Sequence, residues 1–80
     1  MADQPQFDRL RRNCSAKLKQ FILDAHQTER HMQDLNLPAG VQEFHQFMTK
    51  RQAEYDACHE YLLASEQLAD FLNQQLQYIQ

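Results

Sequence analysis

Turn-forming residues are scarce in this sequence, which has one glycine and two prolines among its 80 residues. β-Sandwiches, barrels and disulfide-knotted scaffolds need many turns, so the composition argues against all three. A chain of this length also has room for only one hydrophobic core. We therefore expect residues 1–80 to form a single helical domain.

Cysteine and long apolar runs are scarce as well. The two cysteines, Cys14 and Cys58, are too few for a disulfide framework. No apolar run approaches the roughly 18 residues that span a bilayer, and the first residues show neither the basic nor the apolar segment of a signal peptide. These features predict a cytoplasmic protein with reduced thiols and no membrane association.

The chain has one strong break, at residues 36–40. Pro38 cannot continue the interior of a helix but suits the first turn of a new one, and Asn36 tolerates the left-handed conformation that ends helices. The pattern predicts helices over about residues 4–35 and 38–79, which a short connection makes antiparallel. The expected fold class is all-α, an antiparallel two-helix hairpin that assembles into a four-helix bundle or a helical complex with another protein.

Hydrophobic spacing predicts which faces of the helices meet. In the first helix, steps of three and four residues connect Phe7, Leu10, Cys14, Leu18, Phe21, Ala25, Met32 and Leu35, with an interruption at Thr28 and Glu29. In the second helix, one set recurs every seven residues: Val41, Met48, Tyr55, Leu62, Ala69 and Leu76. A second set lies three residues later in each heptad: Phe44, Arg51, Cys58, Ser65, Leu72 and Ile79. These two sets predict the seam of the hairpin.

This seam predicts particular contacts between the helices. Residues that face each other are expected to have numbers that sum to about 75, within about one helical turn. Phe21 then meets Tyr55, and Arg51 pairs with Asp24, because an unpaired charge in the seam would cost several kcal/mol, about 3–5. The basic stretch of residues 1–22 is expected to lie alongside the acidic stretch of residues 52–80.

The second helix is predicted to carry more apolar surface than the first helix can cover. It is expected to be about ten residues longer, which leaves some 10–15 Å of helix unmatched at the C-terminal end. Leu68 and Phe71 are expected to point away from the seam, which creates a second apolar face. Two helices alone bury little surface, so we expect this face to bind a partner. The predicted partner-binding residues are Leu68, Phe71, Leu72, Leu76, Tyr78 and Ile79.

No motif for catalysis, cofactor binding or metal binding is evident. The histidines and cysteines lack C-x-x-C and H-x-x-x-H spacings, and four converging zinc ligands cannot be assembled from them. With one glycine, the chain has no phosphate-binding loop and no nucleophile elbow. A small hairpin also offers no deep pocket for a small-molecule substrate. We therefore expect neither an enzyme nor a metal or cofactor site.

Two functions remain. The first is a non-enzymatic protein–protein interaction module, such as a small adaptor, an inhibitor or regulator, or a secretion-type chaperone subunit, which binds a protein partner or a second copy. The alternative is a small dimeric hairpin that binds RNA or DNA through basic residues of the first helix: Arg9, Arg11, Arg12, Lys17 and Lys19. The alternative is less favoured, because the net charge of the whole chain is −3.

Overall fold

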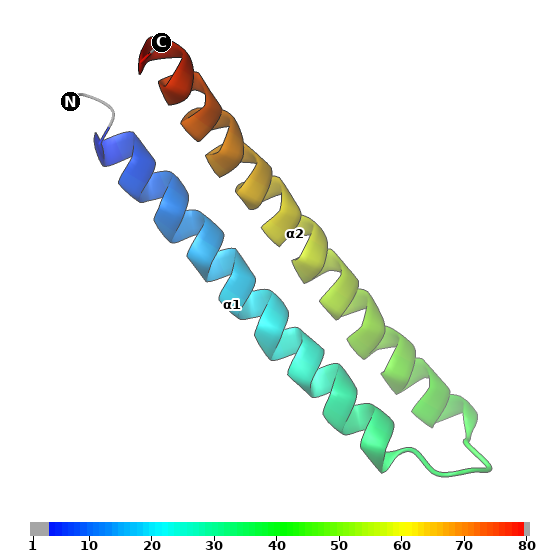
Figure 1. Ribbon diagram of the computed structural model, residues 1–80. Coiled ribbons are helices and arrows are strands. Elements are labelled where there is room, and N and C mark those ends of the chain that lie inside the picture. The colour runs from blue at the N-terminus through cyan, green and yellow to red at the C-terminus, as the bar shows by residue number, and fades with distance from the viewer. Residues whose placement is uncertain (1–3, 80) are drawn as a thin grey trace.

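Two long helices form an antiparallel hairpin in the computed structural model, which describes residues 4–79 and side chains through Gln77. Helix α1 spans Gln4–Asp34, helix α2 spans Val41–Ile79, and residues 35–40 connect them (Figure 1). The described range contains no strand. The predicted all-α hairpin is therefore confirmed.

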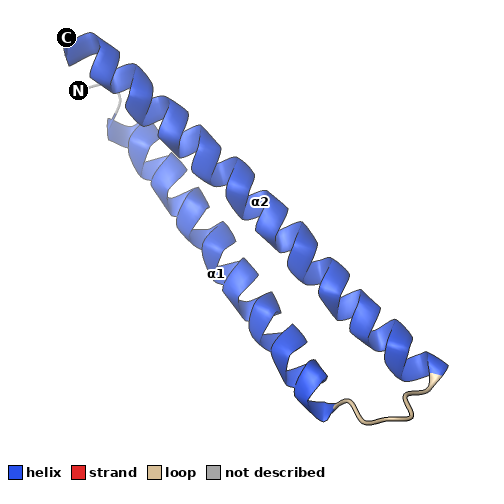
Figure 2. Cartoon of the chain, turned by 45° about the vertical axis from the view of Figure 1, so that its right-hand side comes forward, coloured by secondary structure: helices blue, strands red, loops and turns tan. Residues whose placement is uncertain are grey.

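The molecule is a thin rod. Its extents are 61 × 16 × 15 Å, because α1 and α2 lie side by side along nearly their whole length (Figure 2). The radius of gyration is 18.2 Å, whereas a compact chain of this size has one of about 12 Å. Apolar burial among the described side chains is limited to Ala57, Ala64 and Phe71, and none of these is completely enclosed. The core is thus a single seam between two helices.

Three contacts fix the register of that seam. The Thr28 hydroxyl donates to the backbone carbonyl of Lys50 at 3.2 Å. The ring of Phe7 stacks on Phe71, and the ring of His31 stacks on Phe47, each with 6.2 Å between centroids. In all three contacts the residue numbers sum to 78. The register therefore differs by three residues from the predicted sum of 75, slightly less than one helical turn.

The face that α1 presents to α2 agrees well with the prediction. Its partly buried residues include Phe7, Leu10, Cys14, Leu18, Phe21 and Ala25, whereas Met32 is half-exposed. Leu35, which directly follows α1, is partly buried as well. Thr28 was predicted to interrupt the stripe and is instead the most buried residue of α1, at 5% exposure. Its hydroxyl lies within 3.1 Å of the Asp24 carbonyl as well as near Lys50, so the polar group is satisfied inside the seam.

The predicted face of α2 was largely wrong, because only Cys58 and Ser65 of its described residues are partly buried. The side of α2 that meets α1 carries Phe47, Ala57, Tyr61, Ala64, Leu68 and Phe71. Phe21 therefore stacks on Tyr61, at 6.5 Å between ring centroids, and not on Tyr55. Ala57 and Ala64 have no bulk beyond Cβ, which leaves room for aromatic rings of both helices beside them. This packing leaves the heptad set of Tyr55 and Leu62 outside the seam.

The predicted ion pair between Arg51 and Asp24 does not form within the described part of the chain. Arg51 is exposed, because it belongs to the face that turns away from the seam. The Asp24 carboxylate instead accepts hydrogen bonds from the Gln20 side-chain amide, at 3.3 Å to each oxygen. A charge that stays in water needs no buried partner, which removes the reason for the prediction.

The ends of the helices differ from the prediction by a few residues. Helix α2 begins at Val41, three residues later than expected, because the Gly40 carbonyl accepts its first helical hydrogen bond from the Phe44 N–H at 3.1 Å. In the observed register, Gln4 lies opposite residue 74 and Asp34 lies opposite Phe44. Helix α2 therefore extends five residues, about 8 Å, beyond the start of α1 and three residues beyond its end, rather than ten at one end.

Candidate protein-binding surface

The most prominent surface feature is an apolar stripe along α2. We define the apolar stripe as the exposed heptad residues Val41, Phe44, Met48, Tyr55, Leu62, Leu72 and Leu76. Their exposed fractions range from 36% to 75%. Spacings of three, four, seven and ten residues keep them on one side of the helix. The stripe therefore runs along nearly the whole length of α2 without cover from α1.

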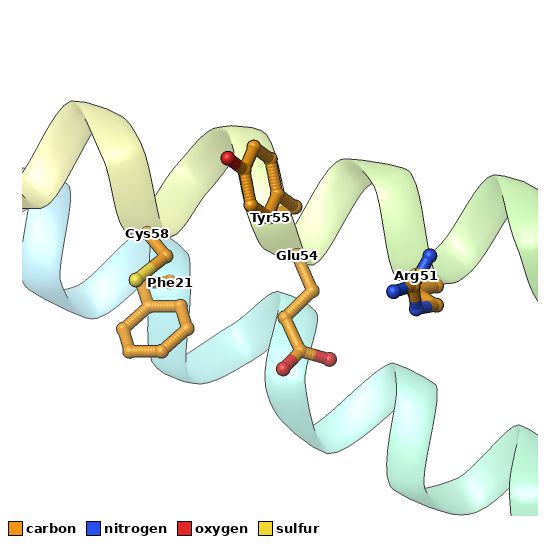
Figure 3. A pocket seen from close by; sticks show the side chains of 5 residues that line it. All are labelled: Phe21, Arg51, Glu54, Tyr55 and Cys58. Carbon is orange, nitrogen blue, oxygen red and sulfur yellow. The ribbon is translucent and has the colours of Figure 1, made fainter.

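A groove of about 220 Å³ deepens the middle of this stripe. Its walls are formed by Phe21, Arg51, Glu54, Tyr55 and Cys58 (Figure 3). The Tyr55 ring points away from α1, whereas Phe21 reaches across from α1 to lie beside Cys58. Because its walls are mainly apolar, the groove suits an apolar side chain from another molecule. Arg51 and Glu54 contribute one charge of each sign to its walls.

The opposite side of α2 is more polar than the apolar stripe. Gln67 lies five residues after Leu62, and at 100° per residue this places it about 140° around α2 from the apolar stripe. The groove on that side is lined by Gln6, Arg9, Leu10, Gln67, Asp70, Phe71 and Gln74. Exposed large apolar side chains also occur away from the stripe, at Ile22, Leu23 and Leu63, but they do not continue in a heptad spacing. A stripe of seven such residues in heptad spacing is more typical of a docking surface than scattered exposed apolar groups are.

The six predicted partner-binding residues differ in where the structure places them. Leu72 and Leu76 are exposed at 44% and 58% and belong to the apolar stripe. Leu68 is half-buried and Phe71 is only 7% exposed, because both lie on the face toward α1. The prediction that Leu68 and Phe71 point away from the seam was therefore wrong. The predictions for Tyr78 and Ile79 lie outside the described side chains.

Five residues of the apolar stripe were not predicted to bind a partner, although the sequence pattern included them. Val41, Phe44, Met48, Tyr55 and Leu62 belong to the heptad pattern that was assigned to the hairpin seam. A heptad pattern is typical of a surface that packs on a helix. It could not indicate whether that surface packs on α1 or on another molecule.

The basic residues of α1 are partly engaged by acidic side chains. The Arg11 guanidinium lies 3.0 Å from the Asp8 carboxylate and 5.4 Å from the centre of the Phe7 ring. Lys17 lies 3.8 Å from the Glu60 carboxylate of α2, which confirms that the basic and acidic stretches lie alongside each other. Of the predicted nucleic-acid patch, Arg9, Arg12 and Lys19 are exposed. The Lys17–Glu60 contact places an acidic group beside the patch, which opposes the approach of phosphate.

Neither metal chemistry nor similarity to known proteins adds a site. Within residues 4–79, no group of three or more His, Cys, Asp or Glu side chains is placed to hold a metal ion, and Cys14 and Cys58 are free thiols. No helix in this range combines the length and apolar character needed to cross a membrane. The chain matches no protein-family model, no curated protein and no solved structure.

Proposed function

We propose that this chain is a non-enzymatic protein–protein interaction module that binds through the apolar stripe. The observation that supports the proposal is the exposure of seven large apolar side chains in heptad register on one side of α2. Burying a large apolar side chain completely is worth about 1.5–3 kcal/mol. Folding of the hairpin leaves these side chains exposed, so burying them against a partner would contribute a large favourable free energy to association.

The spacing of the stripe also indicates the shape of the partner. Residues at heptad spacing interlock with another helix, because each side chain enters a gap between four residues of the facing helix. Arg51 falls within this pattern, and a single polar residue at such a position sets the register of the partner. We therefore propose a helical partner surface. Adaptors, inhibitors and secretion-type chaperone subunits are roles that such a module can serve.

Site-specific photo-cross-linking in cells tests the proposal. A photoreactive phenylalanine analogue replaces Tyr55 in the apolar stripe, and a matched variant carries it at Gln67 on the polar side. We expect irradiation to give a discrete protein adduct from position 55 and none from position 67. Equal adduct yields from the two positions, or no discrete adduct from position 55, would contradict the proposed function.

A further inference from the structure

We infer that the partner which covers the apolar stripe is a second copy of the same chain, packed antiparallel across a two-fold axis level with residue 60. This inference rests on the proposed function and specifies the partner. It follows from three properties of α2: the pairing of large with small side chains, the distribution of charge, and the amount of uncovered surface. Together these make the stripe complementary to itself, as a two-fold interface requires.

The first property is the pairing of side-chain sizes. Residue 60 is the midpoint of Val41–Ile79, so antiparallel helices overlap completely when facing residues have numbers that sum to 120. In this register each member of one heptad set faces a member of the other set, as antiparallel helices require. Representative pairs are Met48 with Leu72, Tyr55 with Ser65, and Arg51 with Ala69. Tyr55 and Arg51, the two longest side chains near the middle of these heptad sets, thus face the small side chains of Ser65 and Ala69.

The second property is the charge distribution along α2. Lys50 and Arg51 are its only basic residues apart from histidine, and both precede the midpoint. Acidic residues lie on both sides of the midpoint, with Glu43, Glu54 and Asp56 before it and Glu66 and Asp70 after it. Antiparallel packing inserts Arg51 between Ala69 and Glu66 of the second copy, so opposite charges meet. Parallel packing would instead place Arg51 against Arg51, and juxtaposed like charges oppose association. The charge pattern therefore favours the antiparallel arrangement.

The third property is the surface that the isolated chain leaves in water. The hairpin exposes 6646 Å², whereas a compact monomer of 9.6 kDa exposes about 5,100 Å². The excess is larger than the roughly 800 Å² that each partner contributes to an interface of standard size. Figure 3 shows the groove beside Cys58. In the same register, Leu62 of the second copy faces this groove and supplies an apolar side chain to fill it.

Thiol cross-linking of purified protein tests both the partner and its orientation. In a Cys14→Ser, Cys58→Ser background, Met48→Cys and Leu72→Cys are made singly and together, and each protein is treated with a short bis-maleimide. Two copies of residue 48 lie about 36 Å apart along the axis of an antiparallel pair, too far for the reagent to bridge. We expect covalent dimers from the double variant and none from either single variant. Efficient dimer formation by Met48→Cys alone would establish a parallel arrangement and overturn the inference.

A charge exchange provides a second test that leaves the cysteines and the seam untouched. Arg51→Glu and Glu66→Arg are each expected to raise the dimer dissociation constant on the order of 10- to 100-fold, because each change affects two contacts per dimer. The combined variant restores opposite charges and is expected to recover most of the association. No recovery would overturn the inference. A monomeric wild-type protein that still gives Tyr55 adducts in cells would overturn self-pairing while leaving the proposed function intact.

Discussion

Replacing Phe71 with alanine is expected to destabilise the hairpin itself rather than its association. Phe71 is 7% exposed and is the largest buried side chain of α2, with its ring stacked on Phe7 of α1. Truncating a buried phenylalanine to alanine typically costs about 3–5 kcal/mol in folding free energy. Phe71 lies eight residues from the end of α2, where the helices can partly close around the gap. We therefore expect about 3 kcal/mol, the lower end of that range.

Urea unfolding followed by far-ultraviolet circular dichroism measures this loss. Wild type and variants are compared at one protein concentration, because association raises the apparent stability. The matched control is Gln74→Ala, an exposed substitution in the same part of α2, which is expected to change stability by less than about 0.5 kcal/mol. If Phe71→Ala unfolded at the same urea concentration as wild type, then Phe71 would not pack against α1 as described.

Three further predictions concern the seam and its edges. Thr28→Val removes the hydroxyl that reaches the Lys50 carbonyl, and urea titration is expected to show a loss of about 1 kcal/mol; a gain in stability would contradict the role of that bond. Glu60→Ala breaks an exposed ion pair with Lys17, so the same titration is expected to show a loss of less than about 1 kcal/mol; a larger loss would mean that the pair is more than a surface contact. Attaching a bulky maleimide to Cys58 is expected to block association without reducing helix content, whereas association that persisted in the fully modified protein would place the interface elsewhere.

The fold could be predicted from sequence because the evidence for it is local. Asn36 and Pro38 provide the only strong break between two long helical patterns, and a short connection between helices brings them together. The prediction placed the start of α2 three residues early because Pro38 suits a first helical turn, yet Gly40 accepts the first helical hydrogen bond. Such a difference depends on the local path of the loop, which residue types alone do not determine.

The seam was harder to predict than the fold, because α2 carries two faces that both follow a heptad spacing. One contains Tyr55 and Leu62, and the other, offset by one residue, contains Tyr61 and Leu68. The first is the more apolar, so periodicity favoured it as the seam. The structure uses the second, where the small side chain of Ala64 accommodates aromatic rings. Periodicity indicates which faces of a helix are able to pack, but side-chain shape decides which of them packs on α1.

Sedimentation equilibrium tests most directly whether a second copy covers the apolar stripe. Wild-type protein is expected to approach about 19 kDa with rising concentration, twice the 9.6 kDa of one chain. Leu62→Asp places a charge at the centre of the stripe and is expected to sediment as a 9.6 kDa monomer with its helix content retained. A wild-type protein that stays at 9.6 kDa at every concentration, or a Leu62→Asp variant that still forms dimers, would contradict the proposed interface.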